Sequence, residues 1–429
     1  MATLLVQAQP MKPLLPVTLV GRYFYAGHER FLVNGVVYNP HHIWDRPGGP
    51  PPDALADDQI GDVERSIPLL KDLGINTILV FCIDENKQHD NSMKLLAKAG
   101  IYVLPCLTSF GHTISPDSPA ESYTPRLLKH CLAVVDAMEK YPNTLGFMAS
   151  VNVITDTEST RAAPVIRAVV RDVKKYLALL SAVKKQRLIP VGISVRDVYP
   201  LRKLQFEYFA GGGPKEAIDF FSLENFLWKG KSTMVESGYQ NLMHTYYTTH
   251  VPVFFSEYGN NEVRPRLFKE TIEMLTNPTL LNVFSGGIVR EFFNSPKQYG
   301  LIERVDNPVL ARVRFEKRDE FRSLRWSLKN CYGPYVCRTL DLDELQGRIV
   351  PTAGNIRFST SRFGVRPDIP PQSKIWLATW KIPFSPLDWG NIKSKALQQE
   401  VDDEEWNDVA VLPAGENDWV DVAEEYGAP

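Results

Sequence analysis

Glu257 is the carboxylate best placed for chemistry in this sequence. It lies in the stretch 251–261, where a short apolar run rich in Val and Phe passes into Ser256, Glu257, Tyr258 and Gly259. An apolar run of this length, bounded by turn residues, predicts a buried strand. The catalytic groups of α/β barrels lie at the C-terminal ends of such strands. We therefore expect Glu257 in a catalytic position, and the alternative is a scaffold residue that braces its barrel neighbours.

A regular alternation of strands and helices is predicted to position this carboxylate. Apolar runs typical of buried strands alternate with segments of helical spacing, and one such helix, Asp57–Leu73, is followed by Gly74 as a stop. Continuous apolar strands, each followed by a helix, are typical of a closed parallel sheet. The predicted strands are Phe31–Tyr38, Asn76–Ile83, Ile101–Leu107, Thr144–Val151, Leu188–Ser194, Ala217–Leu223, Val251–Glu257 and Val283–Phe292.

This alternation predicts an α/β fold of the TIM (β/α)8 barrel type. An open doubly wound sheet is the alternative, and it is disfavoured because no G-x-G-x-x-G loop follows the first strand. Residues Arg312–Lys329 are predicted to form a charged helix that closes the barrel. The expected domains are an N-terminal segment (1–20), the barrel (21–330), a C-terminal extension (331–394) and a disordered acidic tail (395–429).

Charge and cysteine content narrow the function classes. The chain has 429 residues and a formal net charge of −2, with no Lys or Arg after Lys395, so the rest is mildly basic and nucleic acid is not an expected partner. No apolar run predicts a membrane span, and neither terminus has the pattern of a secretory signal or lipid anchor. The five cysteines are odd in number and lack metal spacing. We expect a cytoplasmic protein without metal or cofactor.

Several longer motifs are shared with a known family. They are SIPLLKDLGINTI at Ser66–Ile78, AGIYV at Ala99–Val103, AAPVIRAVVRD at Ala162–Asp172, IPVGIS at Ile189–Ser194, VPVFFSEYG at Val251–Gly259, SGGIV at Ser285–Val289 and YGLI at Tyr299–Ile302. Through them the chain, from about Gly21 to Ile302, resembles the fungal β-1,3-glucanosyltransferases of glycoside hydrolase family 72. The resemblance is carried by the whole series of motifs and not by any single one.

The resemblance implies a TIM barrel that acts on β-1,3-glucan with retention of configuration. It places Glu257 on the family's nucleophile. A retaining mechanism uses two carboxyl groups about 5–5.5 Å apart, one as nucleophile and one as general acid and base. The residues expected to line the substrate cleft are Tyr38, Asp84, Glu224, Asn225, Tyr258 and Glu291.

Asn152 is the departure from the family with the largest consequence. It stands where the resemblance implies the acid/base glutamate. An amide neither gives up nor accepts a proton at neutral pH, and general acid–base catalysis is typically worth about 10²–10⁴-fold. Cysteines of the family are also missing, at Val63, Ser92, Lys229 and Asn260. Their loss agrees with the expected reducing compartment.

Glu224 is a carboxylate gained at the end of the sixth predicted strand. The residues Glu224, Asn225 and Phe226 stand where the family has a sugar-contacting Asn-x-Tyr. Glu224 could act as a displaced acid, and so could Asp156 and Glu158, just past the fourth strand. The alternative for each of the three is a solvated loop residue.

The acidic tail carries a separate pattern. An acidic lead, a Trp, two further residues and a Val occur twice, with Trp406 and Val409 in the first copy and Trp419 and Val422 in the second. The pattern is similar to short motifs that bind ubiquitin-like autophagy proteins by adding a strand to their sheet. A solvated acidic tail is the alternative.

Three functional hypotheses follow. The first is a glucanosyltransferase-like protein with a β-1,3-glucan-type cleft, catalytically impaired by Asn152 and retained for binding or as a scaffold. The second is an active retaining β-1,3-glucanosyltransferase in cell-wall glucan remodelling, with a relocated acid such as Glu224; the family's location at the cell surface is the alternative to the cytoplasm. The third is an adaptor or cargo that acts through the tail motifs.

Overall fold

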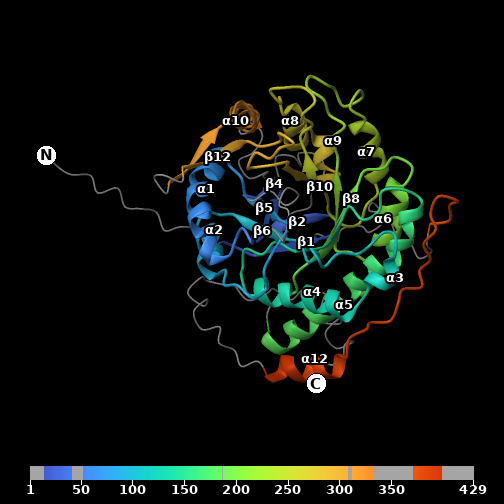
Figure 1. Cartoon of the computed structure of the whole chain (residues 1–429). Helices are drawn as coiled ribbons and strands as arrows, with labels where there is room; N and C mark the ends of the chain where they lie inside the picture. The colour runs from blue at the N-terminus through green and yellow to red at the C-terminus, as the bar shows by residue number, and fades with distance from the viewer. Residues whose placement is uncertain (1–13, 41–51, 186, 308–311, 332–370, 399–429) are drawn as a thin grey trace.

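Eight parallel strands form a barrel at the centre of the protein (Figure 1). The computed structural model describes residues 14–40, 52–185, 187–307, 312–331 and 371–398. The barrel strands are β4 (Val33–Val37), β5 (Thr77–Val80), β6 (Tyr102–Pro105), β7 (Phe147–Val151), β8 (Val191–Arg196), β9 (Phe220–Glu224), β10 (Val253–Tyr258) and β11 (Phe284–Val289). The predicted TIM (β/α)8 barrel is confirmed.

The barrel closes at two seams. β11 returns to pair with β4, and there Gly286 adopts a φ of 86°. A Cβ at Gly286 would overlap the Val33 carbonyl, so only glycine permits this close approach. The other seam joins β6 to β7 through parallel bridges, from Val103 to Thr144 and from Cys106 to Met148.

Helices surround the barrel because each amphipathic segment buries its apolar face against the strands. α1 ends at Gly74, whose φ of 70° provides the left-handed cap that glycine favours. The Thr124 hydroxyl oxygen accepts a hydrogen bond from the Leu127 amide (3.2 Å) and caps α4. The helices of this layer are η1 (Asp57–Gln59), α1 (Ile60–Leu73), α2 (Asp90–Lys98), α3 (Pro119–Ser122), α4 (Pro125–Met138), η2 (Glu158–Ala162), α5 (Ala163–Lys184), α6 (Arg202–Ala210), α7 (Tyr239–Tyr246), α8 (Lys269–Thr276) and α9 (Pro278–Leu281).

A small antiparallel sheet covers the N-terminal end of the barrel. It consists of β1 (Val17–Val20), β2 (Tyr23–Ala26) and β3 (Glu29–Phe31). Phe24 of β2 is fully buried, and its ring centroid lies 6.0 Å from that of Phe220 and 5.9 Å from that of Phe254. Because Phe220 and Phe254 lie at the starts of β9 and β10, Phe24 plugs the bottom of the barrel and leaves the opposite mouth free for chemistry.

Truncating the plug is expected to destabilise the protein strongly. Phe24→Ala removes a ring that packs against two barrel aromatics, and the loss of burial plus the cavity costs about 3–5 kcal/mol. Urea denaturation measures the change in the free energy of unfolding. Phe110→Ala is the matched control, since Phe110 is 56% exposed and surface changes stay within about 0.5 kcal/mol. Similar values for both variants would contradict the assignment of Phe24 as a core plug.

The chain after the barrel forms a hairpin and a helix where one charged helix was predicted. β12 (Ile302–Asn307) pairs with β13 (Arg312–Lys317), and α10 (Asp319–Cys331) begins only after this hairpin. The prediction of a helix from Arg312 is therefore wrong. Half-buried Val313 and Phe315 alternate with exposed residues, a period that suits a strand. The Phe315 ring packs against Phe293, with centroids 5.2 Å apart.

A C-terminal segment, residues 371–398, runs back over the helix layer. Its helix α12 (Trp389–Gln398) contacts α5 (Figure 1), where the Lys175 ammonium lies 4.2 Å from the Trp389 ring centroid. In the described ranges, no helix is both long and apolar enough to cross a membrane. The predicted tail motifs, with Trp406, Val409, Trp419 and Val422, lie outside the described residues. The predicted domain boundaries stay predictions.

Candidate functional site

Four polar side chains meet at the C-terminal ends of the barrel strands. Glu224 is the last residue of β9, and Glu257 is the penultimate residue of β10. Asn152 follows β7 directly, and Arg290 follows β11. The strands are parallel, so their carboxyl ends open on the same mouth of the barrel, the face at which barrel enzymes place their chemistry.

Glu257 is almost fully buried, with 3% of its surface exposed. Its Oε2 accepts a hydrogen bond from Arg290 Nη1 at 2.6 Å. Burial raises the pKa of the Glu257 carboxyl to about 7, with Glu224 and Glu291 adding to the rise while Arg290 opposes it. Among the described residues Oε1 has no hydrogen-bond partner. Glu257 is thus a carboxylate with one oxygen anchored and the other open to a ligand.

Glu224 lies beside Glu257 in the barrel wall. The two residues are paired in the register of β9 and β10, and neighbouring strands are about 4.8 Å apart. The Asn152 side-chain amide donates a hydrogen bond to Glu224 Oε2. Arg196 Nε lies 3.6 Å from the same oxygen. The structure therefore brings Glu224 together with Asn152, at the expected acid/base position, and with Glu257, at the expected nucleophile position.

Asn152 has an unusual backbone conformation at this site. Its φ is 53°, in the left-handed region that asparagine tolerates better than most residues. The backbone amide is anchored by donating to the Ser194 carbonyl at 2.9 Å. The side-chain Oδ1 is buried and has no partner among the described residues. Such an unpaired buried acceptor costs free energy unless a ligand or water satisfies it.

Two further residues expected in the cleft also lie close to this centre. Asn225 donates from its backbone amide to the Glu257 carbonyl (2.9 Å) and from Nδ2 to Asp197 Oδ2 (2.6 Å). Asn225 therefore links the end of β9 to the end of β10 and to Asp197, which follows β8. Glu291 is 8% exposed, and its Oε1 is buried without a partner in the described part of the chain. It contributes negative charge beside Glu257.

Three other expected cleft residues engage different neighbours. No hydrogen bond joins them to Glu224 or Glu257 within the described ranges. Their partners are Ser66 for Tyr38 (O–O 3.0 Å), Thr271 for Tyr258 (O–O 2.9 Å) and Asn86 for Asp84 (backbone N to Oδ1 3.1 Å). Tyr38 and Tyr258 are 1% exposed, and their hydroxyls contact α1 and α8 of the helix layer. Their place in a substrate cleft stays a prediction.

The sequence reasoning did not identify Arg290, Arg196 or Tyr299 as site residues. The Arg290 guanidinium lies 5.4 Å from the Tyr299 ring centroid, and Tyr299 lies 5.6 Å from Phe226, centroid to centroid. Tyr299 and Phe226 are half-buried. Aromatic faces of this kind beside carboxylates can carry the apolar face of a sugar. Arg196 ends β8 and Arg290 directly follows β11, and nearness to the ends of the predicted strands was the only available signal.

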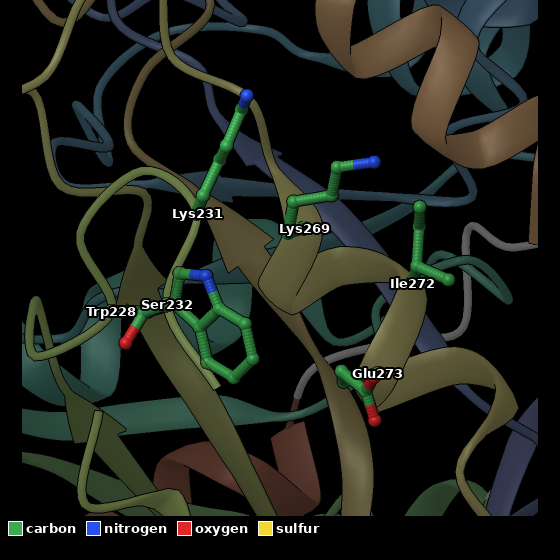
Figure 2. A pocket seen from close by; sticks show the side chains of 6 residues that line it. All are labelled: Trp228, Lys231, Ser232, Lys269, Ile272 and Glu273. Carbon is green, nitrogen blue, oxygen red and sulfur yellow. The ribbon is translucent and has the colours of Figure 1, made fainter. Parts of the chain in front are cut away.

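A hollow of about 320 Å³ has a separate set of lining residues, which are shown in Figure 2. Trp228 lines one side, and Ile272 and Glu273 of α8 line another, with Lys231, Ser232 and Lys269 around them. None of these six residues belongs to the carboxylate site. Trp228 is 4% exposed, so its indole is part of the core and not an open platform.

Glu270 of α8 is a second buried carboxyl whose pKa burial raises to about 7. Because the folded-state pKa values of Glu257 and Glu270 exceed the ordinary value, the folded protein binds these protons more tightly than the unfolded chain. We expect the free energy of unfolding to fall as pH rises from about 4.5 to about 7. Urea titrations at pH 5 and pH 8 should show a smaller drop for Glu270→Gln, by up to about 3 kcal/mol. An unchanged drop would be inconsistent with a buried, proton-binding Glu270.

A parallel barrel with buried carboxyl groups at adjacent strand ends is an arrangement that glycoside-processing enzymes use. Residues 6–325 match the glucanosyltransferase family, glycoside hydrolase family 72. The chain belongs to this family, as the sequence resemblance predicted.

The relatives include two fungal 1,3-beta-glucanosyltransferases. The chain is 36% identical to the 1,3-beta-glucanosyltransferase GAS5 of Saccharomyces cerevisiae, over 83% of this chain and 67% of that protein. It is also 36% identical to gel1 of Aspergillus fumigatus, over 68% of this chain and 62% of the relative. The chain thus spans about two thirds of these relatives. A solved structure of a Saccharomyces cerevisiae Gas2p mutant in complex with laminaritetraose and laminaripentaose has a TM-score of 0.71 and 30% identity, over 87% of this chain and 75% of that one.

The predicted cytoplasmic location is wrong. The family comprises cell-wall glucanosyltransferases, which are secreted or cell-surface enzymes. The prediction relied on the patterns of the two termini and on the missing family cysteines, and Cys106 and Cys131 are indeed free and buried. However, a chain that buries a core of this size does not need disulfides to fold. The loss of the family cysteines therefore does not indicate in which cellular compartment the protein is found.

Proposed function

We propose that this protein transfers glycosyl units of β-1,3-glucan, with Glu257 as the nucleophile. The observation that supports this role is the state of Glu257: it is buried at a strand end, anchored through Oε2 by Arg290 and open at Oε1. In a retaining mechanism such a carboxylate attacks the anomeric carbon and forms a glycosyl-enzyme. An acceptor sugar then takes the glycosyl unit from Glu257.

The surroundings of Glu257 support a sugar as ligand. Asn152 Oδ1, Glu291 Oε1 and Arg290 Nε are buried polar atoms without partners in the described residues. Sugar hydroxyls both donate and accept hydrogen bonds, so they can satisfy all three groups. The half-buried rings of Tyr299 and Phe226 add apolar contact area. β-1,3-Glucan is the proposed polymer because Gas2p, which has the same fold, was solved with laminari-oligosaccharides.

A catalytically impaired glucan-binding protein is the second candidate. It is favoured by the amide at Asn152, where the family resemblance implies a glutamate. Under this alternative the site holds glucan but turns it over very slowly. The adaptor role through the tail motifs rests on residues outside those described, and it stays a prediction.

Product lengths separate the two candidates. The purified full chain is incubated with a reduced β-1,3-gluco-oligosaccharide, and the products are followed by mass spectrometry. Products longer than the substrate support transfer. No products from the native chain, together with binding in calorimetry and activity in Asn152→Glu, would establish the impaired alternative. Neither products nor binding would overturn the proposed glucan site.

A further inference from the structure

We propose that Glu224, oriented by Asn152, is the group that transfers the proton in this site. The family resemblance implies that an amide and a carboxyl group have changed places between two strand ends, so that the proposed proton donor lies on β9 instead of after β7. This inference rests on the proposed function, since it needs a glycosyl unit on Glu257. It assigns Glu224 as a catalytic residue and Asn152 as a positioning residue.

The contacts of Glu224 leave one oxygen for the substrate. Asn152 Nδ2 donates to Oε2, and Arg196 Nε approaches the same oxygen at 3.6 Å. In the described chain, Oε1 has no hydrogen bond. Glu224 is 7% exposed, so its side chain is held by its surroundings while Oε1 stays available. A general acid needs this combination of fixed direction and one free oxygen.

The position of Glu224 also suits a retaining reaction. Glu224 and Glu257 are register partners on adjacent parallel strands. Neighbouring strands lie about 4.8 Å apart, so these register partners are neighbours at the barrel mouth, as the paired carboxyl groups of a retaining enzyme must be. The charge of Glu224 is felt at Glu257, where it helps to raise the pKa.

Asn152 is suited to orient Glu224 without competing for the proton. Its amide is a neutral donor, so it fixes Oε2 and adds no negative charge. A carboxylate at this position would instead repel Glu224. The φ of 53° directs the side chain from the end of β7 toward β9, and asparagine adopts this conformation at little cost. The two substitutions therefore fit each other, because the Asn152 amide donates a hydrogen bond to the Glu224 carboxyl group.

The other two candidate acids have partners elsewhere. Asp156 Oδ1 accepts the Ser159 amide at 2.8 Å and caps the turn that begins η2. Glu158 is 79% exposed in its side chain and pairs with Arg161 at 3.2 Å. Neither residue contacts Asn152 or Glu257 among the described residues. Glu224 is therefore the carboxyl group that the fold brings to the reacting position.

The reaction balances with these two residues. In the first step Glu257 Oε1 bonds to the anomeric carbon, the glycosidic C–O bond breaks, and the Glu224 proton passes to the leaving oxygen. In the second step an acceptor hydroxyl gives its proton to Glu224 while its oxygen bonds to the anomeric carbon. The ester bond to Glu257 then breaks, and both carboxyl groups return to their starting states. No further reactant is required.

An activated donor separates the role of Glu224 from that of Glu257. We compare the native full chain with Glu224→Gln on a β-1,3-gluco-oligosaccharide and on a β-1,3-gluco-oligosaccharyl fluoride, whose leaving group needs no proton. On the natural donor, we expect Glu224→Gln to lose about 10²–10⁴-fold in rate. On the fluoride, glycosyl-enzyme should still form on Glu257, and mass spectrometry of peptides locates the label. Azide, which needs no base, should restore turnover by accepting the glycosyl unit.

The outcomes distinguish this inference from the proposed function. A native chain that turns over neither donor and carries no label overturns the proposed function. A labelled, active native chain with Glu224→Gln equally active on the natural donor overturns only the role of Glu224. A label on Glu224 itself would reverse the two roles and also overturn the inference. Glu139→Gln is the control, because Glu139 is a buried carboxylate paired with Lys184 at 2.6 Å, away from the mouth.

Two variants test Asn152 as a positioning residue. Asn152→Gly keeps the left-handed backbone accessible but removes the donor. We expect a loss of about tenfold or more on the natural donor and no loss on the fluoride when azide is the acceptor. Asn152→Asp replaces the donor with a charge, so Glu224 should hold its proton to higher pH and the alkaline limb of activity should move upward. An unchanged limb, or equal losses on both donors, would contradict orientation of Glu224 by Asn152.

Discussion

Replacing Glu257 with Gln is expected to lower the rate of glycosyl transfer on the order of 10⁴-fold or more, because the nucleophile of a covalent mechanism is removed. The amide is isosteric and its oxygen can still accept the hydrogen bond from Arg290 Nη1, so the fold should persist. Product formation from a β-1,3-gluco-oligosaccharide is measured under single-turnover conditions. The activated fluoride should not rescue this variant, since no ester can form.

Glu270→Gln is the matched control for Glu257→Gln. Both glutamates are buried and both have a pKa that burial raises to about 7, but Glu270 lies on α8 and not at the barrel mouth. We expect its transfer rate to equal that of the native chain. If Glu257→Gln retained native activity, the assignment of Glu257 as nucleophile would be wrong. If both variants lost activity equally, general instability and not chemistry would explain the loss.

Replacing Arg290 with Gln is expected to shift the acid limb of activity to higher pH. A nucleophile must be ionised, and in the native protein the pKa of Glu257 is about 7 although the Arg290 charge and hydrogen bond lower it. Removing Arg290 therefore raises this pKa further, and a smaller fraction of Glu257 is ionised at pH 6. We expect transfer at pH 6 to fall by about 10–100-fold, since each pKa unit is a factor of ten. The profile of kcat/KM from pH 4.5 to pH 9 measures the shift.

Arg290→Lys provides the charge-matched comparison. Lysine keeps the positive charge but not the planar geometry of guanidinium, so the acid limb should stay near its native position while the rate falls modestly. An acid limb that does not move in Arg290→Gln would show that a group other than Glu257 sets it. Above pH 9 we expect Glu257 to be ionised in both variants. Any remaining difference in their rates then reports only the geometry of the side chain at position 290.

The barrel and the place of Glu257 could both be predicted from the sequence. Strand and helix periods are local properties, and the apolar run that ends at Glu257 is visible in one short window of residues. The same locality explains the error at 312–317. The charged segment there adjoins the following helix in sequence, and its strand pairing with β12 is visible only in three dimensions.

What the sequence by itself determined is therefore the architecture, the family and one carboxylate. Only the tertiary structure decided how the site is assembled. Asn152 and Glu224 are 72 residues apart, and Arg290 follows Glu257 by 33, yet each pair is in contact. Such contacts depend on strand register and barrel closure, which no local pattern encodes. Asn152 in the sequence indicates a lost acid, whereas in the folded barrel its left-handed backbone turns the amide onto Glu224.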